Sequence, residues 1–237
     1  MRGVFVTGTG TGVGKTLVAA GLLKALRDAG AVALPMKPVQ TGCPEEGGML
    51  TASDLEFSIR MAGLKPDVQL LDLMCPFRYV PACSPHLAGR LSGIQPDVRT
   101  IRNKMERLSN SCDFLVAEGA GGVLVPLNEN EKMLDLMVEL NWPVILVARG
   151  DLGTINHSLL SLAVLRNAGL RIAAVVVNHL TEDASLVTED NPGAIAKFGE
   201  VPLTMEIPYM PGVEGSVINT SFMRTMSVLA GKILELP

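Results

Sequence analysis

The chain has 237 residues, of which 48% are hydrophobic and 19% are charged, and its formal net charge is −4. This composition is typical of a globular protein and favours neither nucleic acid nor an anionic membrane as a partner. Met1-Arg2 leads directly into an apolar strand, and no apolar run is long enough to span a bilayer. We therefore expect a cytoplasmic protein with one domain over residues 1–237.

The four cysteines show no metal-binding or catalytic spacing. They form no C-x-x-C pair; they are Cys43, Cys75, Cys83 and Cys112. In a reducing compartment we expect them to be free thiols without a metal or a catalytic role.

The first predicted elements are an apolar strand at residues 3–6, a glycine-rich segment at 8–16 and a helix from Leu17. A phosphate-binding loop requires this order, because its glycines let backbone N–H groups converge on phosphate oxygens. Lys15 would then reach the terminal phosphates, and the Thr16 hydroxyl would hold Mg²⁺. The first glycine, Gly8, stands one residue earlier than in the usual spacing. A simple Gly/Thr-rich turn is therefore the alternative.

A second strand is predicted at residues 31–36, and Pro35 favours a short strand near a sheet edge. Lys37 and Thr41 follow it in a loop. Residues 43–53 are rich in Gly, Pro and Glu, and we expect them to be mobile. A helix then begins at Ser53-Asp54, where Asp54 is either a first-turn acid that the helix dipole favours or a Mg²⁺ ligand.

The middle of the chain contains another strand that ends in an acid. Residues 76–85 are punctuated by prolines and predicted to be irregular. Ser84-Pro85-His86 begins a helix, with His86 more often a surface or capping histidine than a catalytic one, and a further helix covers 97–108. A strand at 112–117 then leads to Glu118. This acid resembles the second acidic element of P-loop enzymes, and an ordinary loop acid is the alternative.

The last third alternates between helices and strands. Helices are predicted at 133–140, from Gly153-Thr154 onwards and at 221–234, and strands at 144–148 and 172–177. Residues 202–209 are predicted to form a last short strand and its exit loop, and residues 181–194 a loop or a short helix. Asn178 and His179 follow one of these strands. The alternation predicts an α/β fold with a mostly parallel sheet and helices on both faces, a P-loop NTPase-like three-layer sandwich. Its candidate ligand groups share one edge, at 8–16, 37–41, 118–122 and 178–179.

Several segments in order resemble the dethiobiotin synthetase family across roughly residues 3–210. They are residues 8–16, Lys37-Pro38-Val39-Gln40-Thr41-Gly42, Ser53-Asp54, Ser84-Pro85-His86, residues 118–127, Gly153-Thr154-Ile155-Asn156-His157 and Glu206-Ile207-Pro208. The resemblance implies ATP-dependent closure of a cyclic urea. The diamine 7,8-diaminononanoate (7,8-diaminopelargonate) takes up CO2 or bicarbonate as a carbamate, ATP converts the carbamate into a carbamic–phosphoric anhydride, and the second amine displaces phosphate to give dethiobiotin.

The resemblance also implies roles for individual residues. Lys15, Lys37 and Thr11 would act in catalysis, and Thr16, Asp54 and Glu118 would bind Mg²⁺. Nucleotide would contact Gly12, Val13, Gly14, Lys15, Thr16, Leu17, Asp54, Glu118, Gly119, Ala120, Gly121, Asn178, His179, Ile207, Pro208 and Tyr209. Substrate would contact Thr41 and, from the partner subunit of a homodimer that completes the site, Gly153, Thr154 and Asn156.

The chain departs from one common family form, Gly-Thr-Asp-Thr-Glu-Val-Gly-Lys-Thr, because Gly10 and Gly12 replace the two acids. Contacts of those acids cannot be transferred, so the preference among ATP, CTP and other nucleotides stays open. We expect the loop to be more flexible for the same reason.

Two other functions compete with this interpretation. Partition and division-site ATPase switches carry an additional lysine near the start of the loop, and residues 7–13 contain none. Their membrane-targeting members also need a basic amphipathic tail, whereas residues 221–237 contain only Arg224 and Lys232 as basic residues. A corrinoid amidoligase would need a glutamine-hydrolysing domain, for which this length leaves no room.

Overall fold

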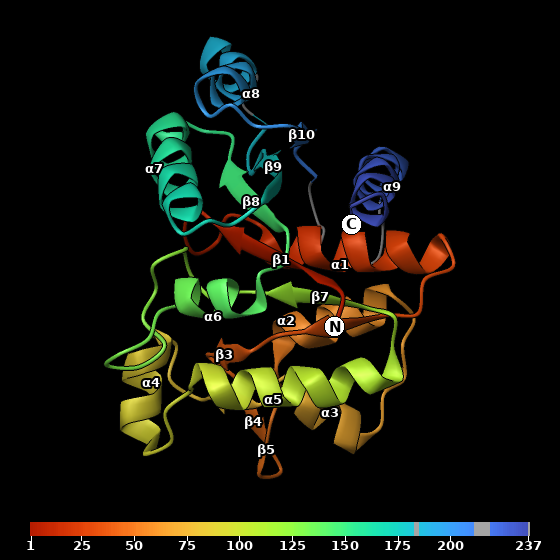
Figure 1. Ribbon diagram of the computed structural model, residues 1–237, viewed down its shortest axis with the longest axis vertical. Helices are drawn as coiled ribbons and strands as arrows, with labels where there is room; N and C mark the ends of the chain where they lie inside the picture. Colours follow the sequence, from red (N-terminus) through yellow and green to blue (C-terminus); the bar gives the residue numbers. More distant parts are fainter. Residues whose placement is uncertain (183–184, 211–218, 237) are drawn as a thin grey trace.

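A six-stranded parallel sheet forms the centre of the computed structural model, which describes residues 1–182, 185–210 and 219–236. The strand order is β10-β9-β8-β1-β7-β2 (Figure 1). The strands are β1 (Gly3–Gly8), β2 (Ala33–Met36), β7 (Phe114–Glu118), β8 (Val144–Arg149), β9 (Ile172–Asn178) and β10 (Thr204–Ile207). β2 is an edge strand, as Pro35 predicts, because proline has no N–H for a second neighbour.

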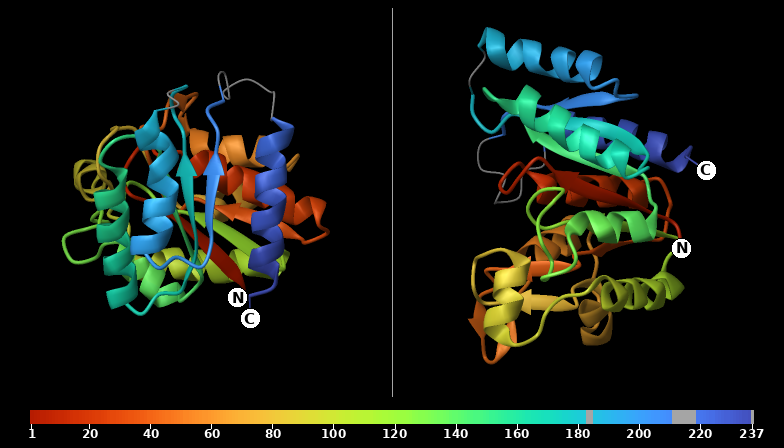
Figure 2. Two further views of the ribbon diagram at one scale, coloured as in Figure 1. Left: turned by 90° about the horizontal axis from the view of Figure 1, so that it is seen from above. Right: turned by 60° about the vertical axis from the view of Figure 1, so that its left-hand side comes forward.

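Helices cover both faces of this sheet. Side chains alternate along β1, so that Val4 and Val6 pack with α1 (Lys15–Asp28) and α9 (Thr220–Leu234). Phe5 points into the opposite core, which includes residues of α5 (Val98–Leu108), α6 (Met133–Leu140) and α7 (Thr154–Asn167). Figure 2 shows the same three layers from two further directions. The predicted α/β sandwich is therefore confirmed.

α8 (Leu186–Phe198) packs on α7 and β10. It replaces the loop or short helix predicted for 181–194, of which residues 183–184 lie outside the described part of the chain. Within the described ranges, none of the helices is both long enough and apolar enough to cross a bilayer.

The segment between β2 and β7 is more regular than the sequence suggests. The predicted mobile residues 43–53 contain a hairpin of β4 (Glu45–Glu46) and β5 (Met49–Leu50), which turns at two glycines with positive φ. The predicted irregular residues 76–85 contain β6 (Phe77–Tyr79), which pairs in parallel with β3 (Val39–Thr41). The remaining elements are α2 (Ser53–Met61), α3 (Val68–Met74), α4 (Pro85–Ser92) and the 3₁₀ turn η1 (Ser109–Ser111).

These corrections have a physical cause. β6 is only three residues long, and it is a strand because the backbone of β3 lies beside it. Such pairing over a long sequence separation leaves no periodic signal in so short a run. α3, which the sequence did not predict, begins where the Asp67 carboxylate accepts a hydrogen bond from the Leu70 N–H at 2.8 Å.

Gly21 lets α1 and α9 pack closely. A Cβ at this position would lie 2.3 Å from Cζ of Phe222 and 2.8 Å from Cγ of Met226, and both side chains are fully buried. We expect Gly21→Ala to lower the free energy of unfolding, because overpacking costs about 1–3 kcal/mol while alanine gains only about 1 kcal/mol of helix propensity. Urea denaturation would measure the change.

The matched control is Gly231→Ala in α9, where a Cβ would meet no atom within 4 Å. Its free energy of unfolding should rise by up to about 1 kcal/mol. If Gly21→Ala raised the urea midpoint as Gly231→Ala does, the close α1–α9 packing would be disproved.

Candidate functional site

The loop between β1 and α1 is fixed from β9. Gly14 precedes α1 with φ 98°, and a Cβ there would lie 2.1 Å from Nδ2 of Asn178, so only glycine fits. Asn178 is buried and donates through Nδ2 to the Val13 carbonyl at 3.1 Å. Lys15 Nζ donates to the Gly10 carbonyl at 2.7 Å. The loop thus holds its shape while its lysine folds back over it.

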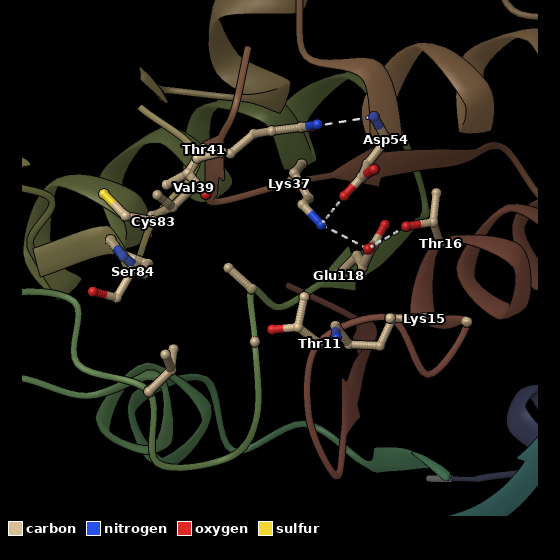
Figure 3. Close-up of a pocket in the computed structure, with 18 residues that line it drawn as sticks. Thr11, Lys15, Thr16, Lys37, Val39, Thr41, Asp54, Cys83, Ser84 and Glu118 are labelled. Carbon is tan, nitrogen blue, oxygen red and sulfur yellow. Dashed lines mark hydrogen bonds and ion pairs between the residues drawn. The ribbon is translucent and has the colours of Figure 1, made fainter. Parts of the chain in front are cut away.

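An ion cluster lies beside this loop, in which Lys37 and Glu118 are buried and Asp54 is partly exposed (Figure 3). Lys37 follows β2, and its Nζ lies 2.6 Å from Oδ2 of Asp54 on α2 and 2.6 Å from Oε1 of Glu118 at the end of β7. The Thr16 hydroxyl on α1 donates to the same Glu118 oxygen at 2.8 Å. Four elements therefore place two carboxylates, one hydroxyl and one ammonium group in contact.

The two lysines differ in how strongly they hold their protons. Burial and the neighbouring Lys37 ammonium lower the pKa of Lys15 to about 8. Burial also disfavours the charge on Lys37, but the Glu118 and Asp54 carboxylates outweigh it and raise the pKa of Lys37 above its ordinary value. Lys37 therefore stays charged, whereas Lys15 titrates within the range in which enzymes work.

Two adjoining cavities share Gly14, Thr16 and Asp54. The first has a volume of about 710 Å³, and the predicted residues that line it are Thr11, Gly12, Gly14, Lys15, Thr16, Lys37, Thr41, Asp54, Glu118, Ala120 and Gly121. The second has a volume of about 550 Å³, and its predicted residues are Gly14, Thr16, Leu17, Asp54, Asn178, His179, Pro208 and Tyr209. Val13, Gly119 and Ile207 are buried and line neither cavity.

The predicted partner-subunit residues lie apart from both cavities of a single chain. Gly153 is the N-cap of α7, and Thr154 and Asn156 belong to its first turn. None of the three lines either cavity. Their contact with substrate therefore stays a prediction, which requires a second copy of the chain.

The structure adds residues that the sequence reasoning missed. Ser53, Phe57 and Arg60 line the second cavity from one face of α2. They are spaced four and three residues apart, which places them on one face of a helix. Because the sequence already predicted that α2 begins at Ser53, this spacing could have identified them as neighbours of Ser53. Gln40 and Ser84 line the first cavity. Both lie inside motifs that were recognised without a role for either residue.

The oxygen donors of the cluster suit a hard divalent cation. Thr16 and Glu118 place two such oxygens 2.8 Å apart, and Asp54 supplies a second carboxylate in the same cavity wall. Across the described residues, no group of three or more His, Cys, Asp and Glu side chains is arranged to hold a metal. Thr16, Asp54 and Glu118 are the residues that would hold such a cation, and water or a bound ligand would complete its coordination.

The four cysteines carry free thiols. Burial raises the pKa of Cys75 to about 12 and that of Cys112 to about 11, which keeps both thiols protonated at neutral pH. Cys83 lines the first cavity.

Known proteins resemble the whole chain. A family model described as an AAA domain matches residues 2–217. The ATP-dependent dethiobiotin synthetase BioD of Thermodesulfovibrio yellowstonii is 34% identical over 96% of this chain and 97% of its own length. The protein of the same name from Anaeromyxobacter sp. (strain Fw109-5) is 38% identical over 98% of this chain and 99% of its own length.

Solved structures share the fold. The cell division ATPase MinD of Pyrococcus furiosus superimposes with a TM-score of 0.67 at 21% identity, covering 100% of this chain and 99% of that one. A ParA family ATPase from Chlorobium tepidum gives a TM-score of 0.57 at 14% identity, covering 99% of each chain. At these identities the likeness concerns the P-loop NTPase fold alone. The sequence relatives are much closer, and the chain therefore belongs to the family of ATP-dependent dethiobiotin synthetases.

Proposed function

We propose that this chain forms dethiobiotin from 7,8-diaminononanoate, CO2 and ATP, with Mg²⁺ as cofactor. One amine adds to CO2 and loses a proton to give a carbamate. A carbamate oxygen then takes the γ-phosphoryl group of ATP, which gives a carbamic–phosphoric anhydride and ADP. The second amine attacks the carbonyl carbon, loses a proton and expels phosphate as the urea ring closes.

One observation carries this proposal beyond family membership: both lysines, Lys15 and Lys37, line the cavity that also holds the oxygen donors Thr16, Asp54 and Glu118. A carbamate is a poor electrophile because its charge is delocalised and its oxygen is a poor leaving group. Phosphorylation removes both obstacles. Transfer of the phosphoryl group depends mainly on positioning and on neutralising negative charge, which two ammonium groups provide.

We assign the lysines to different parts of the reaction. Lys15 opens from the Gly10 carbonyl to the β- and γ-phosphates, because it belongs to the loop that cradles them. Lys37 lines the same cavity and stabilises the carbamate and the anhydride as charge moves between them. Thr16, Asp54 and Glu118 would hold Mg²⁺, which supplies further neutralisation of the phosphate oxygens.

The second cavity suits the nucleoside. Asn178 commits its amide N–H to Val13, which leaves its carbonyl oxygen as an acceptor for an amino group on a base. Pro208 and Tyr209 supply apolar surface in the same cavity. A Cβ at Gly10 or Gly12 would meet no atom within 4 Å, so open space lies where the common family form carries acids. ATP is the expected nucleotide, and the panel of nucleotides below tests that choice.

We also infer that two copies of the chain complete the site. The start of α7 would receive the distal carboxylate of the substrate from across the interface, since a helix N-terminus favours an anion. Leu152, just before this helix, is 86% exposed, which suits a contact surface. The four free thiols fit the reducing environment of the cytoplasm.

The first prediction concerns substrate dependence. Phosphate release should require diamine, bicarbonate, nucleotide and Mg²⁺ together, because the carbamate is the phosphoryl acceptor. A coupled phosphate assay over ATP, CTP, GTP and UTP, with mass spectrometry of the product, would measure this. Equal phosphate release without the diamine would contradict the proposal and favour an ATPase switch.

The second prediction concerns Lys37. Lys37→Met keeps the length of the side chain but removes its charge, so kcat should fall by about 10²–10³-fold per folded molecule while ATP binding changes little. Lys24→Met is the matched control, since Lys24 pairs with Asp28 on the surface of α1. Full activity in Lys37→Met would refute the role assigned to this residue.

The third prediction concerns pH. Because the pKa of Lys15 is about 8 in the empty site, and bound phosphate favours the charged form, nucleotide binding should take up a proton above pH 8. The affinity for nucleotide should therefore change little from pH 7 to 8 and fall by about tenfold for each further pH unit. Calorimetry in buffers of different ionisation enthalpy would detect the proton. In Lys15→Arg, which stays charged, the uptake should disappear; its persistence would exclude Lys15 as the titrating group.

A further inference from the structure

Helix α2 begins without a cap of its own. Its N-cap residue is Ala52, which offers no side-chain acceptor for the free N–H groups of the first turn. Alanine is among the poorest N-cap residues, and this turn carries Asp54 into the active-site cavity. The sequence of α2 by itself therefore does not fix the position of this carboxylate.

Gln40 on β3 supplies the missing cap from outside the helix. Its Oε1 accepts a hydrogen bond from the Asp54 N–H at 3.3 Å, and its Nε2 donates to the Ser53 hydroxyl at 2.8 Å. The orientation of the amide follows from these partners, because only an oxygen can accept from the Asp54 N–H. Gln40 is 4% exposed, so both bonds are shielded from water.

The first turn of α2, which Gln40 contacts, carries one residue of the ion cluster, Asp54. Asp54 Oδ2 lies 2.6 Å from Lys37 Nζ, and Lys37 stands only three residues before Gln40 in the chain. The segment Lys37–Gln40 therefore contacts the first turn of α2 at both of its ends: Gln40 binds the Asp54 N–H, and Lys37 binds the Asp54 carboxylate. A shift of the first turn of α2 would move the carboxylate that fixes one side of the Lys37 ammonium.

We propose that Gln40 is a positioning residue that holds the first turn of α2, and with it Asp54, against Lys37. The catalytic consequence rests on the proposed function, which assigns Lys37 and Asp54 to the reaction. The structural consequence does not depend on it. Gln40 acts through Asp54, although its side chain also borders the cavity.

The test uses the full chain with Gln40→Met, which keeps the size of the side chain and removes both hydrogen bonds. Hydrogen exchange of the backbone amides at 53–56 should become about tenfold faster, as expected for the loss of a helix cap, while exchange elsewhere stays unchanged. We expect kcat for dethiobiotin formation to fall by about tenfold or more, because Asp54 is no longer held against Lys37. Gln69→Met, on an exposed position of α3, is the matched control and should change neither quantity.

A second-site variant separates positioning from direct contact with substrate. Ala52→Ser gives α2 a side-chain cap, so Gln40→Met combined with Ala52→Ser should recover both the slow exchange and kcat. Recovery of exchange without recovery of kcat would show that Gln40 acts on the reacting groups directly and would overturn the proposal. Unchanged exchange at 53–56 in Gln40→Met would overturn it as well.

Two further results keep the test decisive. If Gln40→Met fails to fold, the combination with Ala52→Ser should fold with α2 protected, because the serine supplies an acceptor to the first turn; rapid exchange at 53–56 in that variant would overturn the proposal. The exchange measurement needs no substrate. A wild-type protein that makes no dethiobiotin would therefore refute the proposed function, while the effect of Gln40 on α2 could still be established.

Discussion

The Lys37 ammonium group, held between the carboxylates of Asp54 and Glu118 at 2.6 Å from each, is the interaction on which the site depends. It ties together β2, α2 and β7, which are separated in the chain but meet at one edge of the sheet. Lys37 and Glu118 are both buried, so removing either of these two leaves an uncompensated charge, at a cost of about 3–5 kcal/mol. The cluster thus stabilises its own geometry as well as presenting charge to a ligand.

In the proposed reaction, the same cluster would serve both the Mg²⁺–nucleotide and the anionic substrate. The Thr16 hydroxyl and the Lys37 ammonium both donate hydrogen bonds to the same oxygen of Glu118. One carboxylate therefore contacts both the start of α1, just after the phosphate loop, and the second lysine. A cation arriving at Thr16 and Glu118 would compete with Lys37 for that oxygen and leave the ammonium freer to face the cavity. The two lysines also influence each other, since the charge on Lys37 helps to lower the pKa of Lys15.

Much of this arrangement could be predicted because it follows from local rules. The order strand, glycine loop and helix at residues 3–29 specifies a phosphate site, and the buried runs at β7, β8 and β9 specify a parallel sheet. Short elements escaped prediction for a different reason. β6 has three residues and is a strand because it pairs with β3, which is distant in the sequence. β4 and β5 have two residues each and pair with each other across a tight turn. A run of two or three residues covers at most one or two repeats of the strand period of two, which is too short for periodicity to detect.

The sequence by itself determined the fold class, the phosphate loop and the set of polar groups that emerge at the carboxyl ends of strands, because strand periodicity and the rule that parallel strands end together are local properties. Only the tertiary structure decided which groups touch. Lys37 meets Glu118 across 81 residues, and Gln40 caps α2 across 14. These contacts depend on side-chain direction and on the packing of neighbouring elements, which spacing along the chain does not encode.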